Sequence, residues 1–156
     1  MPRAILTLLL LSAVSAAAFD RRAIVPPGFS SGGPFSPGIL VDGTTLYAAG
    51  QIGRDAKTKS IPSEFEAEVG AALDNVGAIL REAGMDFKDV VSVQVYLTDM
   101  ELFDRMNAVY MKRFPEPRPA RTTVGVAKLV GTAHVEITVT ARKEGPVVRP
   151  AAGGSQ

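Results

Sequence analysis

The sequence predicts an α+β domain in which two helices pack on one face of a mixed β-sheet. Segments 62–83 and 98–113 repeat apolar residues every three or four positions, as amphipathic helices do. Segments 39–52, 90–97 and 122–142 are rich in β-branched residues and contain the alternation of half-buried strands. In chain order the predicted elements are strand, strand, helix, strand, helix, strand and strand, and few residues separate them.

Length and composition exclude several classes of protein. With 156 residues the chain has the size of one domain and is long enough to bury a core without disulfides. Its 17 basic and 16 acidic residues nearly cancel, so no basic footprint for nucleic acid is expected. The absence of cysteine excludes disulfides, thiol nucleophiles and cysteine ligands, and a single histidine does not make a conventional zinc site by itself. We therefore expect no metal site.

The first segment, 1–18, has the pattern of a secretory signal peptide. Arg3 supplies the charged start, an almost wholly apolar run follows, and small residues at 15–18 form a cleavage site, which we place after Ala18. The alternative is a membrane anchor, but a span needs roughly 20 apolar residues and this run is shorter. The expected location is therefore the periplasm or the exterior, with no stable membrane anchor after processing.

A loop and a hairpin are predicted next. Residues 19–32 are expected to be a linker, and the many prolines and glycines of 25–38 predict an irregular loop. The Asp42–Gly43 pair between 39–41 and 45–52 predicts a tight β-hairpin. The small residues 48–50 allow another group to approach the backbone closely.

The helix predicted over 62–83 ends at Gly84, because glycine commonly closes a helix. Glu64, Glu66 and Glu68 near its start agree with the helix dipole, and we expect them to form a solvated face.

The strand over 90–97 is expected to point its odd-numbered residues inward, from Val91 to Leu97. The residues Thr98-Asp99-Met100-Glu101 then have the pattern of a capping box that starts the second helix.

The stretch 118–142 carries the charges that suggest a site. Pro117 and Pro119 restrict the residues before them to extended backbone, so the approach to Arg121 is stiff. Strands are predicted over 122–127 and 133–142, and the face of the second that carries Glu136 is otherwise uncharged apart from His134, which we expect to be a bystander in that strand. Residues 145–156 are expected to form a flexible tail.

Two interpretations of Arg121 and Glu136 are open from the residues alone. If the last two strands form a hairpin, the two side chains bracket a small molecule, and the planar guanidinium suits a carboxylate because it donates two parallel hydrogen bonds. Alternatively, Arg121 is a surface residue at a strand end and Glu136 is its cross-strand ion-pair partner. Composition alone favours the second interpretation.

Several motifs resemble the YjgF/Rid family of reactive-intermediate deaminases, in particular its RidA-type members. The resemblance runs from about 33 to 143, and any one motif is weak, whereas their order and spacing together are specific. The motifs are Gly50-Gln51-Ile52, 72–76 with 79–80 and 83–84, Asn107-Ala108-Val109-Tyr110 with Phe114, Pro119-Ala120-Arg121, and Val135-Glu136-Ile137.

The resemblance implies a chorismate-mutase-like fold over 33–144 that assembles as a homotrimer with its clefts between subunits. It also implies hydrolytic deamination of enamine and imine intermediates of amino acids, like that of a 2-iminobutanoate/2-iminopropanoate deaminase, to 2-oxo acids and ammonia without a cofactor. Arg121 would clamp the substrate carboxylate and Glu136 would position water.

The resemblance implies further substrate-binding positions at Phe35, Gly50, Thr123 and Asn107. Phe35 stands where RidA-type members have tyrosine, and its alternative role is to anchor the loop. Asn107 has the alternative role of fixing the following loop by a hydrogen bond. Three more positions depart from the usual pattern, namely Ala49 for serine, Thr123 for cysteine or serine, and Val130 for proline.

Two other functions remain open. One is a non-catalytic exported trimer that binds small 2-oxo acids or other carboxylates through the same arginine. The other is a protein-interaction or holdase role, which would need an exposed apolar patch. Endoribonuclease activity, reported for some relatives, is disfavoured by the near-neutral charge and by the presence of only one histidine.

Overall fold

The computed structural model describes residues 20–30 and 32–145, and the predicted signal segment and nearly all of the predicted tail lie outside them. It contains a seven-stranded sheet in the order β1-β2-β3-β7-β5-β6, with β4 also paired to β7. The strands are β1 (Arg21–Ile24), β2 (Gly38–Val41), β3 (Thr45–Ala48), β4 (Gln51–Ile52), β5 (Val90–Leu97), β6 (Ala120–Gly125) and β7 (Val135–Arg142). The helices are α1 (Phe65–Glu82) and α2 (Phe103–Tyr110), each next to a short 3-10 turn, at Phe87–Asp89 and Met100–Leu102.

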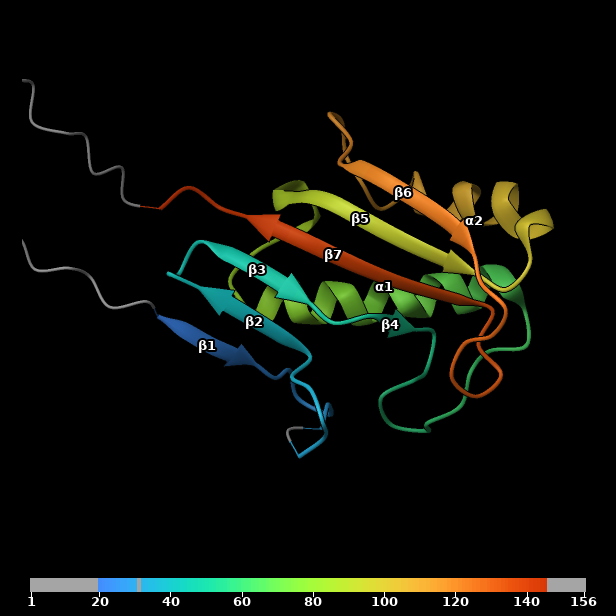
Figure 1. Cartoon of the computed structure of the whole chain (residues 1–156), viewed down its shortest axis with the longest axis horizontal. Helices are drawn as coiled ribbons and strands as arrows, with labels where there is room; N and C mark the ends of the chain where they lie inside the picture. Colours follow the sequence, from blue (N-terminus) through green and yellow to red (C-terminus); the bar gives the residue numbers. More distant parts are fainter. Residues whose placement is uncertain (1–19, 31, 146–156) are drawn as a thin grey trace, which may run out of the picture.

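Both helices lie on one face of the sheet, with α1 running across it and α2 beside β6 (Figure 1). The core between α1 and the sheet is built from residues that are at most 1% exposed: Val69, Leu73, Val76, Ile79 and Leu80 from α1, and Val93, Val95, Ile137 and Val139 from the strands. Their spacing is three or four along the helix and two along the strands. The predicted α+β class with helices on one face is confirmed.

The last two strands do not form the predicted hairpin. β5 lies between them: it pairs with β6 in parallel and with β7 in antiparallel register. Parallel pairing requires a long crossover, and the segment from Thr98 to Pro119, which contains α2, supplies it. Strand β6 is therefore an edge strand, and β7 is buried in the middle of the sheet.

The first hairpin is present, but its second strand is interrupted. β2 pairs with β3 around the Asp42–Gly43 turn, and the chain leaves the ladder at Ala49–Gly50 before β4 rejoins β7. β1 adds an edge strand within the segment that we expected to be a linker. Only its last residue, Ile24, is buried, so its sequence lacks the alternation by which a strand is recognised.

Three local predictions were wrong. Val91 does not point inward, because a register shift between Val90 and Ser92 leaves it half exposed and buries Val90 instead. There is no capping box at Thr98; Asp99 caps the 3-10 turn that precedes α2, and its side chain accepts from the backbone N–H of Glu101. Glu68 is not on a solvated face but is fully buried, for a reason given below.

Within residues 20–30 and 32–145, no helix is long and apolar enough to cross a membrane. The same residues contain no cluster of three or more histidine or acidic side chains placed to hold a metal ion.

Candidate functional site

Glu136 lies on the face of the sheet that carries no helix. In the ladder it stands beside Tyr96 of β5 and Ile52 of β4, while its neighbours Val135 and Ile137 point into the core. Its carboxylate occupies the space above Gly50, where a Cβ atom would overlap Oε1. A glycine at this position therefore makes room for the carboxylate, as the small residues at 48–50 suggested.

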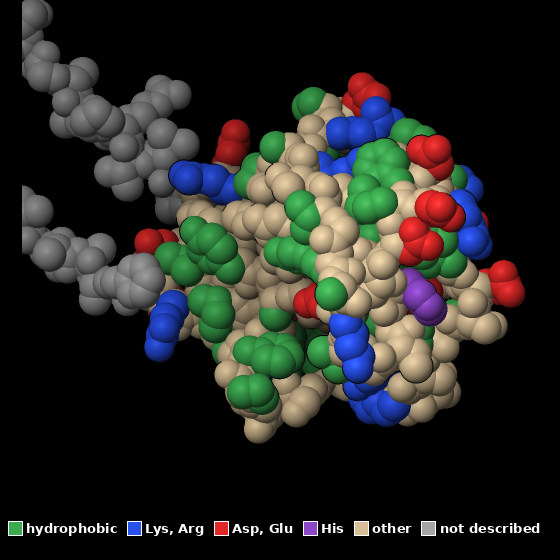
Figure 2. All heavy atoms as spheres, turned by 45° about the vertical axis from the view of Figure 1, so that its right-hand side comes forward, with side chains coloured by type: hydrophobic (Ala, Val, Ile, Leu, Met, Phe, Trp, Pro, Cys, Tyr) green, Lys and Arg blue, Asp and Glu red, His purple; other side chains and the backbone are tan. Residues whose placement is uncertain are grey.

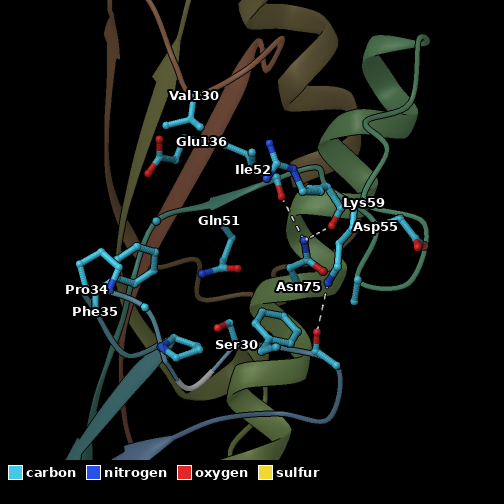
Figure 3. A pocket seen from close by; sticks show the side chains of 17 residues that line it. Ser30, Pro34, Phe35, Gln51, Ile52, Asp55, Lys59, Asn75, Val130 and Glu136 are labelled. Atoms are coloured by element: carbon cyan, nitrogen blue, oxygen red, sulfur yellow. Dashed lines mark hydrogen bonds between the residues drawn. The ribbon is translucent and has the colours of Figure 1, made fainter.

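Next to this carboxylate is a cavity of about 450 Å³ (Figure 3). The loop before β2 forms one side through Pro34 and Phe35, and Glu136 and Val130 lie at another side. Phe29 also lines the cavity. The loop after β4 and the helix α1 close the far side, with Lys59 and Asn75. The cavity thus collects residues from segments that are distant in the sequence.

Two polar side chains of this cavity are held within the chain. Gln51 is 7% exposed, and its Nε2 donates to the carbonyl of Ala49 at 2.9 Å. Asn75 donates through Nδ2 to the carbonyls of Ile52 and Arg54, at 3.0 and 2.9 Å (Figure 3). These hydrogen bonds fix the chain around β4 and use the amide donors.

Arg121 lies on the opposite face of the sheet from Glu136. It stands opposite Val93 in the β5–β6 ladder, so it points to the helix side. Its guanidinium carbon lies 4.5 Å from the centre of the Tyr110 ring and 5.6 Å from that of Phe103. These distances are those of cation–π contacts, and both rings come from α2, which thereby orients the guanidinium.

A shallow pocket of about 400 Å³ surrounds the guanidinium, lined by Asn107, Tyr110, Met111, Arg118, Pro119 and Arg121. No carboxylate of the described residues forms an ion pair with Arg121 or a hydrogen bond with it. The predicted ion pair between Arg121 and Glu136 is therefore not formed within one chain. The guanidinium remains available to an anion from elsewhere.

Tyr110 was not singled out as a site residue from the sequence, yet it is the closest aromatic partner of Arg121. It is 3% exposed, and its hydroxyl group is buried without a hydrogen-bond partner among the described residues. Burial raises the pKa of the Tyr110 hydroxyl, and the nearby positive charge of Arg121 opposes that shift. The sequence did contain one indication that Tyr110 belongs to this site: it lies three residues after Asn107 and therefore on the same face of the helix.

The predicted site residues thus divide into two groups. Phe35, Gly50 and Glu136 line the cavity, whereas Asn107 and Arg121 line the pocket on the other face. Thr123, two residues beyond Arg121, also faces the helix side, where its hydroxyl is buried without a partner in the described part of the chain. The hairpin on which bracketing of a small molecule within one chain depended is absent, and Arg121 and Glu136 of one chain lie on opposite faces of the sheet.

Glu68 explains how the start of β7 is held. Its Oε1 accepts from the backbone N–H groups of His134 and Val135 at 2.7 and 3.3 Å, and its Oε2 lies 2.9 Å from Nδ1 of His134. These contacts satisfy a carboxylate that α1 brings into the interior. Sequence analysis missed this clamp because the partners are 66 residues apart. His134 is hence a partner of Glu68 and not only a strand residue beside Glu136.

Comparison with known proteins places the chain in a family. The family model described as Endoribonuclease L-PSP matches residues 28–143. A RutC family protein of Saccharolobus solfataricus is 42% identical over 112 residues, which cover 71% of this chain and 88% of that protein. A 2-iminobutanoate/2-iminopropanoate deaminase of Bos taurus is 40% identical over 116 residues, covering 74% of this chain and 83% of the other.

The fold agrees with the sequence match. The structure of RidA from the Antarctic bacterium Psychrobacter sp. PAMC 21119 is similar, with a TM-score of 0.70 and 33% sequence identity. The match covers 77% of this chain and 94% of that chain. Some relatives at about 40% identity carry the name of an imine deaminase, and others carry only a family name. Since the match covers most of the described domain in both sequence and fold, the chain belongs to the YjgF/Rid family.

Proposed function

We propose that this protein hydrolyses reactive enamines and imines of 2-amino acids to 2-oxo acids and ammonia. The observation that carries the proposal is a carboxylate, Glu136, seated over Gly50 at the edge of a cavity, together with a guanidinium, Arg121, that has no acidic partner among the described residues. The names of relatives at about 40% identity support the same reaction class.

The reaction needs few groups. Water adds to the imine carbon, forming a C–O bond while the nitrogen takes up a proton. The hydroxyl group of this adduct then gives up its proton to the nitrogen as the C–N bond breaks, so that ammonia leaves and the carbon becomes the carbonyl of the 2-oxo acid. Glu136 accepts the proton of the attacking water and returns it to the departing nitrogen. Arg121 holds the substrate carboxylate by two parallel hydrogen bonds, which fixes the imine carbon for attack.

We propose further that each site is shared between two copies of the chain, in the homotrimer that the family resemblance implies. The two residues point to opposite faces of one sheet, so a substrate that touches both must lie between Glu136 of one copy and Arg121 of another. The helix-free face of the sheet also carries exposed apolar side chains, including Tyr47 and Val124, which a second copy would cover.

Two single variants test the chemistry. Arg121→Ala and Glu136→Gln are each expected to lower the rate of 2-oxo acid release from enzymatically generated 2-imino acids by at least about 100-fold, because removing a positioning or proton-transfer group costs factors of this order. Calorimetric titration with a 2-oxo acid runs in parallel. If the unaltered protein binds the 2-oxo acid but does not turn over the imines, the deaminase proposal fails and the alternative, a non-catalytic trimer that binds carboxylates, is supported.

Mixing the two variants tests the shared site. In randomly mixed oligomers a site is intact when its Glu136 comes from the Arg121→Ala chain and its Arg121 from the Glu136→Gln chain. For a cyclic trimer this occurs in about one half times one half, or roughly a quarter, of the sites. Co-refolded mixtures should therefore recover about a quarter of the original activity. Mixtures as inactive as the separate variants would show that each site belongs to one chain.

We also propose that the protein acts outside the cytoplasm, after cleavage near Ala18. The charged start, apolar run and small residues of 1–18 support this. The mass of the protein recovered from the exported fraction tests it, and a full-length chain confined to the cytoplasm would refute it.

A further inference from the structure

We infer that Tyr110 and Phe114 form a stacked aromatic support that positions the guanidinium of Arg121, and that Tyr110 acts through its ring and not through its hydroxyl group. The inference rests on the proposed function where it concerns turnover, because Arg121 is the proposed carboxylate clamp. All contacts of the support lie within one chain, so they do not depend on a second copy.

Tyr110 is the aromatic residue nearest to Arg121. The guanidinium carbon lies 4.5 Å from the centre of the Tyr110 ring and 5.6 Å from that of Phe103. A guanidinium within about 6 Å of a ring centre is attracted by the negative face of the ring. Tyr110 and Phe103 stand at the two ends of α2, about two helical turns apart, so both rings lie on one side of the helix. The guanidinium is thus held along that side of α2.

A second ring supports Tyr110 from behind. The ring of Phe114 stacks on that of Tyr110, with the centroids 4.3 Å apart and the planes 28° from parallel. Phe87, in the 3-10 turn before β5, meets Phe114 edge to face, with the centroids 5.1 Å apart. Stacked and edge-to-face arrangements of this kind are favourable. The three rings therefore form a continuous column that ends at Arg121.

The column is buried and is backed by α1. Tyr110 and Phe114 are 3% and 2% exposed, so neither ring has open space into which it could turn. At the base of the column, a Cβ atom at Gly77 of α1 would come within 3.1 Å of the Phe87 ring. Because side chains in a protein interior are closely packed, rings held in this way keep one arrangement.

The hydroxyl group of Tyr110 takes no part in this support. It is buried, and it makes no hydrogen bond with the described residues. A buried hydroxyl group without a partner lowers the stability of a fold, so it is not what makes tyrosine suitable here. The face of the ring is what Tyr110 presents to Arg121.

Arg121 needs such a support because little else holds its side chain. Among the described residues its guanidinium forms no ion pair and no side-chain hydrogen bond. A long side chain loses rotamer entropy when it is fixed, and that loss weakens binding. A guanidinium that already lies on a ring is fixed before the ligand arrives, and its N–H donors stay available for a carboxylate.

Substitution of Tyr110 tests the support. Tyr110→Leu removes the ring, and we expect kcat/KM for the imine and the affinity for 2-oxobutanoate each to fall at least about tenfold, because misplaced groups cost factors of this order. Tyr110→Phe removes only the hydroxyl group and should keep both values within about twofold, since the ring face is retained. Unchanged values in Tyr110→Leu, or equal losses in Tyr110→Phe, would overturn the inference.

A measurement apart from activity reports the positioning itself. The NMR order parameter of the Arg121 Nε–Hε group shows how firmly the guanidinium is held on the fast timescale. We expect this order parameter to fall in Tyr110→Leu and also in Phe114→Leu, which leaves Tyr110 in place and removes the ring behind it. It should stay the same in Tyr110→Phe.

Leu46→Ala is the matched control for a general loss of stability. Leu46 is fully buried in β3, which β7 and β5 separate from the strand that carries Arg121. The variant should be destabilised as buried leucine truncations are, yet it should keep kcat/KM and the order parameter of Arg121. Thermal unfolding checks that every variant is folded at the temperature of the assay.

The order parameter also distinguishes failure of the inference from failure of the proposed function. If the unaltered protein neither turns over imines nor binds 2-oxobutanoate, the proposed function fails, and the motion of Arg121 in the variants still tests the support. A folded Tyr110→Leu protein in which the Arg121 guanidinium is held as firmly as before would overturn the inference, whatever its activity.

Discussion

At the scale of single residues, the position of the Glu136 carboxylate depends on the absence of a side chain at Gly50. A Cβ atom there would meet Oε1, Cδ and Cγ of Glu136, all of which belong to one flexible side chain. The fold can therefore absorb a methyl group at 50 by rotating Glu136 away. Under the proposed mechanism such a change would affect turnover more than stability, because the displaced carboxylate is only half buried.

Gly50→Ala is accordingly expected to lower imine turnover at least tenfold while changing the free energy of unfolding by less than about 1 kcal/mol, since a ~1 Å misplacement of a catalytic group has such effects. The matched control is Gly70→Ala on α1, where an added Cβ has no atom within 4 Å. The control should keep full activity and gain about 0.5–1 kcal/mol, because glycine weakens a helix interior. Steady-state kinetics and urea unfolding measure both, and a fully active Gly50→Ala protein would contradict this account of Glu136.

At the scale of secondary-structure elements, a buried carboxylate joins α1 to the beginning of β7. Glu68 is 1% exposed and accepts the backbone N–H groups of His134 and Val135, which precede Glu136 by only one or two residues. Gly53 packs directly on Glu68, where a Cβ would overlap its carbonyl oxygen. The clamp therefore fixes the direction from which the chain enters β7.

Removing the clamp should destabilise the fold. Glu68→Ala leaves the buried N–H group of Val135 and the partly buried one of His134 without an acceptor, and we expect a loss of about 3 kcal/mol in the free energy of unfolding. Glu68→Gln keeps the shape and one acceptor oxygen and should lose less. Removing only the exposed partner by His134→Ala should cost least, under about 1 kcal/mol, because solvent replaces its contact. Urea unfolding gives this order, and a loss for His134→Ala as large as that for Glu68→Ala would contradict it.

A surface ion pair joins α1 to α2 in a way that pH can test. Arg105 donates from Nε and Nη2 to both carboxylate oxygens of Glu66, at 2.7 and 2.6 Å. These hydrogen bonds lower the pKa of the Glu66 carboxyl from its ordinary 4.5 to about 2. A folded-state pKa below the unfolded value means that the stabilisation is full above about pH 4.5 and is lost as the pH falls through about 2.

An NMR titration of the Glu66 carboxyl should therefore have a midpoint near 2, and in Arg105→Ala the midpoint should move up toward 4.5. Arg113→Ala is the matched control, because it removes the ion pair between Arg113, three residues after the end of α2, and Asp74 of α1 and leaves Arg105 in place. A midpoint near 4.5 in the unaltered protein would show that the pair is not held in solution.

The helices and strands were predictable from the sequence, but the order in which the strands lie in the sheet was not. Apolar spacing located α1 and β5 to within a few residues, because period three-to-four and period two are local properties of the chain. The order of β6, β5 and β7 in the sheet is set by contacts across the whole chain, and no local pattern reports it. The burial of Glu68 escaped prediction for the same reason.

The candidate site was predictable in part, for a related reason. The unusual charges Arg121 and Glu136 stand out in strands that carry few others, so the residue types were visible in the sequence. Their faces were not, since the side to which a strand residue points depends on which strand lies beside it. The cavity wall at Phe29 and the ring of Tyr110 under Arg121 depend on tertiary packing alone.

At the scale of the whole molecule, one face of the sheet is left without a helix. Across this face Val124, Tyr96 and Glu136 stand side by side in neighbouring strands, and Tyr47 lies farther along it. Val124 and Tyr47 are 41% and 53% exposed. Figure 2 shows hydrophobic side chains in several patches on the face seen there. A sheet face with exposed apolar residues next to a candidate catalytic carboxylate fits an interface between copies that also completes the site.

Val124→Asp tests that assignment. In an isolated chain the new carboxylate is solvated, so the fold should persist, but between two apolar surfaces it is desolvated without a partner and the assembly should dissociate. Native mass measurement should then show monomers, and imine turnover should fall together with the trimer, because Arg121 of a second copy no longer reaches Glu136. Ala67→Asp places the same charge on the exposed side of α1 and should leave both mass and activity unchanged. If the Val124→Asp protein still forms trimers, the interface lies elsewhere. If it is a monomer that keeps its activity, the whole site belongs to a single chain.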